Sequence, residues 1–332
     1  MLNSGLIGIH TSRGGRLLFA GALFLLVVGV LVLQPGWARQ AITQQQTVTL
    51  DVAVIDRDVD AYGSLTKEEF TVYEDGVKQQ VISLTAQDAP FSLGITIDAS
   101  GSMRDQLPLI QKTALDVISQ MGSADEAFVA AFTANSEVIQ DFTSNQPNLA
   151  NGINKIYTSG ATALLDSIIS ISGYANKRGK NRRKALLFIT DGLEKGSFAD
   201  EDQAVSALIE NQEQAYFVCV PVEVYRPFAG IKKSLKPREQ VDRIARATGG
   251  QSFYLRDSEE SASTAAKLIG SLRHQYEITY APTNKKQNDK MRKVRVVVSP
   301  KDGRQLNVIT RQGYYGPGRK RAAEQGMDKV KG

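Results

Sequence analysis

Five oxygen-bearing side chains of this sequence have the types and spacing that suit a divalent cation. They are Asp98, Ser100, Ser102, Thr162 and Asp191. Two of them directly follow short apolar runs, at residues 93–97 and 185–190. Carboxylate and hydroxyl oxygens are hard ligands of the kind that Mg²⁺ or Mn²⁺ prefers. If both runs are strands of one open α/β sheet, these side chains lie at its carboxyl edge, where ligands bind.

Each part of this pattern is ordinary when taken alone. Asp98-Ala99-Ser100-Gly101-Ser102 is a common kind of surface turn, and Thr190-Asp191-Gly192 is a common strand exit. A threonine in front of a helix, as at Thr162, usually caps that helix. The order of the three parts and their places after predicted strands favour metal binding over these separate explanations.

The elements that must position these residues alternate between strands and helices from residue 91 to 272. Buried strands are predicted at 93–97, 127–132, 185–190, 215–222 and 252–255, and helices at 107–121, 163–174, 202–212, 239–247 and 259–272. Short apolar strands that alternate with amphipathic helices favour a doubly wound, mostly parallel sheet covered on both faces.

Segments with the two-residue period of β-strands lie on both sides of this α/β block, at residues 47–90 and 273–316. The first contains a hairpin signal at Asp75-Gly76, and the second has a further turn at Asp302-Gly303. Each segment has too few strands to be stable alone. We therefore expect one small flanking β-sandwich into which the α/β domain is inserted.

In this arrangement Asp98-x-Ser100-x-Ser102, then Thr162, then Thr190-Asp191-Gly192 resemble the metal-ion-dependent adhesion site of the von Willebrand factor type A (VWA) domain. The resemblance covers roughly residues 91–272 and implies roles for all five residues. Ser100, Ser102 and Thr162 would touch the metal through hydroxyl oxygens, whereas Asp98 and Asp191 would hold it mostly through water. One coordination position would stay open for a carboxylate of a protein ligand. Where relatives often have Gly-Gly-Thr, this chain has Gly160-Ala161-Thr162, and alanine resists a positive φ.

The wider chain resembles a bacterial branch often labelled VWFA-related Acidobacterial domain. The motifs that carry this likeness are Leu65-Thr66-Lys67-Glu68-Glu69-Phe70, Val72-Tyr73-Glu74-Asp75-Gly76 and Arg311-Gln312-Gly313-Tyr314-Tyr315. No settled biochemical activity of that branch follows from the resemblance.

Composition excludes several other classes of function. The net charge of +5 comes from the first segment and from the tail after residue 317, so the remaining body is net neutral and unlike a nucleic-acid binder. The one cysteine, Cys219, lies in an apolar run and is expected to be buried and inert. With two histidines, His10 and His274, most Ser-His and Cys-His machinery is excluded. We expect no enzyme activity.

The N-terminus predicts export. Arg13 and Arg16 precede the uncharged run 17–33, and Gly36 and Ala38 are small residues that suit cleavage after Ala38. An uncleaved membrane anchor through residues 17–33 remains open, because the run is nearly long enough to span a bilayer. Either way residues 39–332 would lie outside the cytoplasm: periplasmic, secreted or anchored in the inner membrane. Residues 317–332 are predicted to be a disordered basic tail.

Two functions therefore remain open. The first is an exported adhesion module whose Mg²⁺ (or Mn²⁺) bridges to an acidic side chain of a protein ligand. The second is a structural or assembly protein of the bacterial cell envelope that acts without metal. For the second, the basic run 177–184 is either a solvated loop or a contact for anionic lipid or a second partner. Partner specificity is expected in the loops 193–200 and 135–151, and neither the partner nor the oligomeric state follows from the sequence.

Overall fold

A computed structural model describes residues 46–56, 59–60, 65–221 and 237–319 of the chain. The predicted signal peptide or anchor at residues 1–38 and most of the predicted tail lie outside the described residues. None of the helices in the described part has the length and hydropathy that a membrane crossing requires.

The central sheet has the strand order β11-β10-β9-β6-β7-β8. Its strands are β6 (Phe91–Asp98), β7 (Glu126–Phe132), β8 (Ser136–Thr143), β9 (Arg183–Thr190), β10 (Glu213–Cys219) and β11 (Ser252–Tyr254). All neighbours pair in parallel except β7 and β8, which are antiparallel. Every residue of β6 is buried, as expected for a central strand that helices cover on both faces. The predicted mostly parallel α/β sheet is therefore confirmed.

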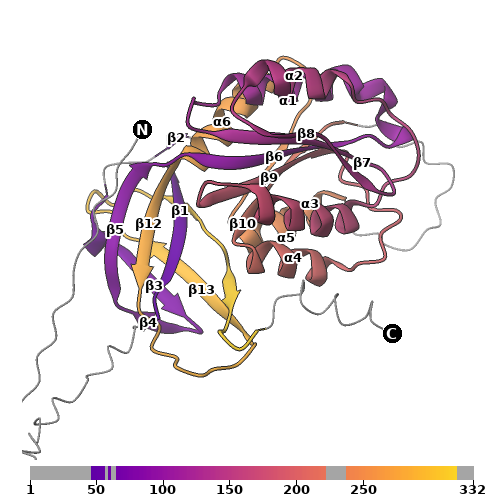
Figure 1. Cartoon of the computed structure of the whole chain (residues 1–332). Coiled ribbons are helices and arrows are strands. Elements are labelled where there is room, and N and C mark those ends of the chain that lie inside the picture. The colour runs from indigo at the N-terminus through magenta and orange to yellow at the C-terminus, as the bar shows by residue number, and fades with distance from the viewer. Residues whose placement is uncertain (1–45, 57–58, 61–64, 222–236, 320–332) are drawn as a thin grey trace, which may run out of the picture. The chain divides into compact units, whose positions relative to one another are not determined.

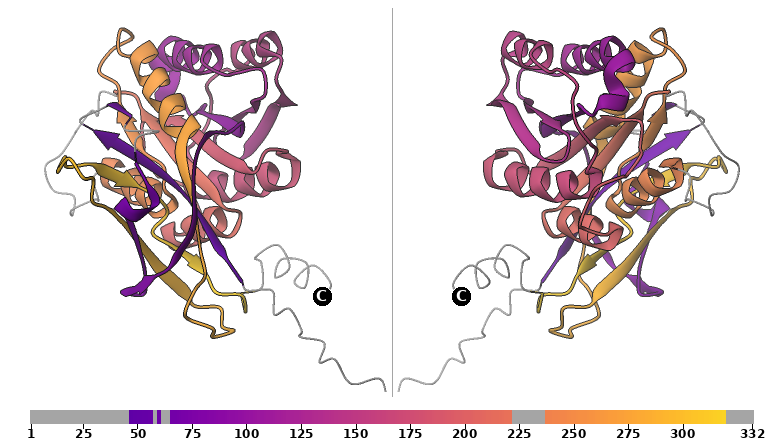
Figure 2. Two further views of the ribbon diagram at one scale, coloured as in Figure 1. Left: turned by 90° about the vertical axis from the view of Figure 1, so that its left-hand side faces the viewer. Right: turned by 90° about the vertical axis from the view of Figure 1, so that its right-hand side faces the viewer.

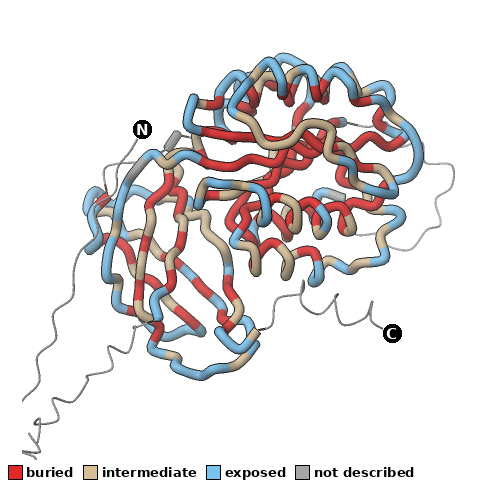
Figure 3. Tube along the Cα trace, viewed as in Figure 1, coloured by how far each residue is buried: buried red, intermediate tan, exposed pale blue. Residues whose placement is uncertain are grey.

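Helices cover both faces of this sheet (Figures 1 and 2). Apolar residues of α1 (Leu107–Ser119), α2 (Gln146–Asn154) and α6 (Ser261–Arg273) pack into one core cluster. Those of α3 (Leu164–Arg178), α4 (Glu201–Glu210) and α5 (Pro237–Thr248) pack into a second cluster on the other face. In Figure 3 the strands are mostly buried, while the helices alternate between buried and exposed positions. This alternation is the amphipathic pattern that the sequence shows.

The structure corrects one expectation inside this block. Residues 135–151 were expected to be a loop, but they contain β8 and the first part of α2. The pairing of β8 with β7 is irregular, because the register shifts twice near Val129. Helix α2 begins after Asn145, whose side chain accepts a hydrogen bond from the backbone of Asn148. This cap starts a helix of poor intrinsic helix formers.

Two smaller sheets combine strands from before and after the α/β block. The first has the order β14-β1-β12-β5, with β2 paired to β1, and the second has the order β15-β13-β3-β4. Their strands are β1 (Val48–Asp56), β2 (Val59–Asp60), β3 (Phe70–Glu74), β4 (Val77–Gln79), β5 (Val81–Asp88), β12 (His274–Tyr280), β13 (Met291–Val298), β14 (Asn307–Ile309) and β15 (Gly313–Tyr315). Apolar residues of both sheets belong to one core cluster.

The two turns predicted in these segments differ in what they connect. Asp75 and Gly76 both have positive φ, at 49° and 82°, and join β3 to β4 as a tight hairpin. Gly303 also has a positive φ of 72°, but the strands on either side of it belong to different sheets. The turn after β13 therefore carries the chain from one small sheet to the other.

Candidate metal site

The candidate site lies where two neighbouring parallel strands end. Strand β6 ends at Asp98 and strand β9 ends at Thr190, with Asp191 next in the chain. The two strands pair in parallel as far as Ile97 and Ile189. Because parallel strands end at the same edge of a sheet, the two carboxylates come to the same place.

Hydrogen bonds join four of the five predicted residues. The Ser100 and Ser102 hydroxyl oxygens are 3.1 Å apart, and Ser102 Oγ donates to Asp191 Oδ2 at 3.2 Å. The backbone N–H of Ser100 donates to Asp98 Oδ1 at 3.0 Å. Asp98 and Ser100 are buried, whereas Ser102 is exposed. The group therefore has a buried base and one solvent-facing hydroxyl.

The fifth residue, Thr162, lies on an adjoining loop. Within the described residues, no hydrogen bond joins its hydroxyl to the other four side chains, although Thr162 is buried. Its loop is tied to the loop after β6: Gly101 N donates to Gly160 O at 3.1 Å, and Ser159 N donates to Ala99 O at 2.7 Å. Gly160 has a φ of +76°, while Ala161 keeps a negative φ. The loop thus needs glycine at position 160, and alanine at 161 causes no strain.

The carboxylates of Asp98 and Asp191 lack a nearby basic side chain within the described part of the chain. Asp98 is fully buried, and this burial raises its pKa; the nearby charge of Asp191 adds to the effect, while hydrogen bonds from Ser100 and Thr190 oppose it. Neither aspartate forms an ion pair with a lysine, arginine or histidine among the described residues. Two carboxylates held together in this way favour a bound cation as the source of the missing charge.

The donor set fits a hard divalent cation. Nowhere in the described ranges do three or more His, Cys, Asp or Glu side chains cluster as a metal site. The direct ligands here would instead be three hydroxyls, with the two carboxylates acting mostly through water that completes the shell. All-oxygen ligation with several waters is typical of Mg²⁺, and its Mn²⁺ counterpart accepts the same ligands.

Two residues outside the predicted ligand set, Thr190 and Glu194, help to order the site. Thr190 Oγ1 donates to Asp98 Oδ2 at 2.7 Å. Glu194 accepts hydrogen bonds from Leu165 N, at the start of α3, and from Ser197 N. Burial raises the pKa of Glu194, but these hydrogen bonds outweigh burial and lower it overall. The visible signals were a threonine before the second aspartate and an acidic residue just beyond it.

The basic run 177–184 lies at the other end of β9, as its position in front of that strand implies. Its arginines are engaged within the chain. Arg182 pairs with Asp51 and Glu277 of the first small sheet. Arg183 is buried and donates to the carbonyls of Leu272 and Arg273 at the end of α6. The run therefore fastens the α/β block to the small sheet and is not simply a solvated loop.

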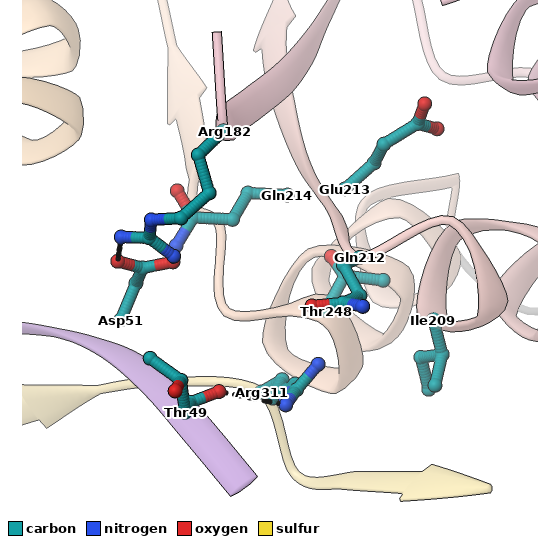
Figure 4. Close-up of a pocket in the computed structure, with 9 residues that line it drawn as sticks. All are labelled: Thr49, Asp51, Arg182, Ile209, Gln212, Glu213, Gln214, Thr248 and Arg311. Carbon is teal, nitrogen blue, oxygen red and sulfur yellow. Dashed lines mark hydrogen bonds and ion pairs between the residues drawn. The ribbon is translucent and has the colours of Figure 1, made fainter. Parts of the chain in front are cut away.

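A small polar cavity lies at this same junction, among Thr49, Asp51, Arg182, Ile209, Gln212, Glu213, Gln214, Thr248 and Arg311 (Figure 4). Its cationic groups already have partners: Arg182 pairs with Asp51, and Arg311 donates to Thr49 O at 2.8 Å. The carboxylate of Glu213 points away from both (Figure 4). This cavity is therefore part of the junction between the α/β block and the small sheet, and the cation site is at the opposite end of β9.

Comparison with known proteins identifies the family of the α/β domain. Residues 93–194 match the family model of the von Willebrand factor type A domain, a range that includes all five predicted site residues. No curated protein matches the chain.

Several solved structures are similar to parts of the chain, all at low identity. A von Willebrand factor type A protein from Catenulispora acidiphila is 14% identical, with a TM-score of 0.47, over 81% of this chain and 75% of that one. The conserved hypothetical protein BatB from Bacteroides thetaiotaomicron is 15% identical, with a TM-score of 0.43, over 55% and 98%. An aerotolerance-related membrane protein from Bacteroides fragilis NCTC 9343 is 14% identical, with a TM-score of 0.44, over 55% and 98%.

Proposed function

The chain carries a von Willebrand factor type A domain, and from this premise we propose that it binds another protein through a divalent cation. The cation is Mg²⁺ or Mn²⁺, held at the carboxyl edge of the central sheet. The partner contributes an acidic side chain. We further propose that the protein acts by binding and not by catalysis.

One observation carries this proposal. Asp98 and Asp191 belong to one hydrogen-bonded group with Ser100 and Ser102, and no basic side chain of the described residues neutralises them. Holding two carboxylates this close in a buried place costs free energy, because like charges repel more strongly away from water. A cation between them removes that cost.

The roles of the residues follow from their placement. The hydroxyls of Ser100, Ser102 and Thr162 are the proposed direct ligands, and Asp98 and Asp191 balance the charge, mostly through water. A bound divalent cation supplies an electrophilic centre with an open position for an anionic oxygen. Ser102 is the exposed member of the set, so that open position lies on the solvent side. A carboxylate of the partner can approach from there.

The surroundings of the site support binding over catalysis. A serine nucleophile needs a general base within hydrogen-bond reach. The Ser100 and Ser102 hydroxyls instead contact each other and Asp191. His274, the histidine within the described residues, lies on β12 in a small sheet, where its Nδ1 is 2.7 Å from Asp88 Oδ1.

We also propose that the protein is exported and that its small sheets form one β-sandwich which carries the α/β domain. The basic residues Arg13 and Arg16 in front of the apolar run 17–33 support export. The core that the two small sheets share supports the sandwich. A structural role in the cell envelope without metal is the alternative, and it predicts partner binding that is indifferent to chelation.

Thermal unfolding of the purified protein with Mg²⁺, with Mn²⁺ and with EDTA tests the proposal. A ligand at about 100 times its Kd stabilises a protein by about 2.7 kcal/mol, which raises Tm by several degrees. Ser102→Ala should abolish the rise. Asp105→Asn is the matched control, because it removes a nearby exposed charge outside the hydrogen-bonded group. If neither metal raises the Tm of the wild type, the alternative of a structural role in the cell envelope without metal is favoured.

A further inference from the structure

Two exposed aromatic side chains lie on the loops that border the candidate metal site. Among the described residues, the large apolar side chains that are exposed are Val77, Ile82, Tyr157, Phe198 and Met291. Tyr157 is 77% exposed, and Phe198 is the most exposed of the five. Single exposed apolar residues are common and need no explanation. The position of Tyr157 and Phe198, both beside the candidate metal site, does need an explanation.

The two loops are connected to the metal-binding loop by close contacts. Tyr157 lies two residues before Ser159, whose N–H donates to Ala99 O, next to Asp98. Phe198 lies two residues after Gly196, where an added Cβ would be 3.2 Å from Thr162 O. The two aromatic residues thus belong to backbone segments that touch the segments of three proposed ligands: Asp98, Ser100 and Thr162.

The loop that carries Phe198 is held in place from both sides. The carboxylate of Asp166, in the first turn of α3, accepts hydrogen bonds from Phe198 N at 3.0 Å and from Ala199 N at 2.9 Å. On the other side, Ser197 Oγ donates to Glu194 Oε2 at 2.8 Å and accepts from Leu165 N at 3.0 Å. A loop fixed in this way loses little conformational entropy on binding.

Each of the two loops carries one exposed lysine, and on the second loop Glu194 and Asp200 offset its charge. Lys155 lies two residues before Tyr157, and Lys195 lies three residues before Phe198; both are exposed. Neither lysine has an ion-pair partner among the described residues. Lys155, on a loop without acidic residues, is therefore the cationic group that can raise the rate at which an acidic partner associates.

From these observations we propose that Tyr157 and Phe198 determine which partner the site accepts. The partner is a protein loop with one aspartate or glutamate flanked by large apolar residues on both sides. Its carboxylate goes to the metal, and its apolar side chains pack against Tyr157 on one loop and Phe198 on the other. This inference rests on the proposed metal-dependent binding. Aromatic residues at a partly buried contact often dominate binding energy.

A displayed library of disulfide-closed peptides tests this inference. Each peptide has a fixed central aspartate with three random residues on each side, and selection on the wild-type protein is done in Mg²⁺. Enriched peptides should carry Leu, Ile, Phe, Trp or Tyr next to the aspartate. The double variant Tyr157→Ser, Phe198→Ser should lose this preference and still select peptides in an aspartate-dependent way.

The enriched peptide then gives a quantitative comparison. Each single substitution should raise its Kd by about tenfold or more, the usual effect of removing an aromatic hot spot. The Mg²⁺-induced rise in Tm should be unchanged in both variants, because neither residue is a proposed ligand. Val77→Ser is the matched control: it removes an exposed apolar side chain on β4, in a different sheet, and should leave the Kd unchanged.

Three outcomes overturn the inference, and they are distinguishable. Aspartate-dependent peptides without apolar neighbours, or an unchanged Kd in both variants, leave the proposed function standing and remove the role of the aromatics. Binding that depends on Phe198 but persists in EDTA shows an apolar surface that works apart from the metal. No aspartate-dependent and EDTA-sensitive selection by the wild type removes the proposed function itself, and this inference with it.

Discussion

Thr190 Oγ1 donates a 2.7 Å hydrogen bond to Asp98 Oδ2, so the last residue of β9 holds the carboxylate at the end of β6. The same hydroxyl oxygen accepts from Gly192 N at 3.0 Å. Both Thr190 and Asp98 are fully buried. With Oδ1 bonded to Ser100 N and Oδ2 bonded to Thr190, the Asp98 carboxylate has one fixed orientation before any cation arrives.

Thr190→Val tests the importance of this orientation. Valine keeps the shape of threonine but cannot donate a hydrogen bond, so Asp98 loses one of its two anchors. Loss of such an outer-shell partner typically weakens metal binding by about 10–100-fold. We expect this loss of Mg²⁺ or Mn²⁺ affinity in calorimetric titration, and Thr190→Ser should retain most of the affinity. Equal affinities of the wild type and the valine variant would show that Thr190 only fills space.

The effect of Asp98→Asn on the free energy of unfolding should have opposite signs without metal and with metal. Without a cation the substitution removes one of two neighbouring buried charges, so the variant should be at least as stable as the wild type in EDTA. With saturating Mg²⁺ the wild type gains about 2.7 kcal/mol at 100 times its Kd, whereas the variant gains little. The two unfolding curves should therefore change order between the two conditions.

A crossing of this kind separates a metal site from a structural hydrogen-bond network. If Asp98 served only to tie β6 to β9, the asparagine variant would be less stable in both conditions. Asp105→Asn again provides the control, since its side chain is exposed and lies outside the hydrogen-bonded group.

Glu213 should make stability depend on pH. It is buried on β10, and among the described residues neither of its carboxyl oxygens has a partner with good hydrogen-bond geometry. Burial raises its pKa from 4.5 to about 8, although Ser172 and the charge of Lys184 oppose the shift. Between these two values the folded chain keeps a proton that the unfolded chain has released. Stability therefore falls as pH rises, by up to about 1.4 kcal/mol per pH unit.

Glu213→Gln removes this titration and should be more stable than the wild type at pH 8. The advantage should shrink toward pH 5, where the wild-type carboxyl is protonated in the folded chain and increasingly protonated in the unfolded one. Urea unfolding at several pH values measures the difference. Glu137→Gln, which changes an exposed glutamate on β8, should show no such trend. A constant difference between wild type and Glu213→Gln at all pH values would contradict the prediction.

The sequence predicts the parts of the candidate site that depend on the order and direction of the strands. Apolar runs before Asp98 and Asp191 predict neighbouring parallel strands, and such strands bring their following residues to one edge. The sequence does not reveal hydrogen bonds between loops. The contacts of Asp166 with Phe198 and Ala199 join residues more than thirty positions apart, and nothing local marks them.

Elements with weak local signals were also missed. Strand β8 lies at the edge of the sheet, where half-buried residues and an irregular register blur the alternating pattern. Helix α2 is short and contains Pro147 and Gly152, which are poor helix formers, so its cap and its packing on the sheet decide its conformation. Tertiary contacts overrode local preference in both cases.

The basic run 177–184 gives the last prediction, because its residues look alike in sequence and differ in the folded chain. Arg183 is buried, and its guanidinium donates to Leu272 O at 3.1 Å and to Arg273 O at 2.8 Å. Arg183→Met keeps much of the volume but leaves both carbonyls without this donor. An unsatisfied buried polar group costs about 1–3 kcal/mol, so we expect a loss of at least about 2 kcal/mol in urea unfolding.

Lys180→Met is the matched control. Its side chain is exposed, and within the described part of the chain its hydrogen bond is made by the backbone N–H, to Glu126 Oε1. Surface changes of this kind usually alter stability by less than about 0.5 kcal/mol. A large difference between the two variants would show that Arg183 stabilises the α/β block through its hydrogen bonds to the end of α6. Equal and small effects would instead show that the hydrogen bonds of Arg183 to α6 contribute little to stability.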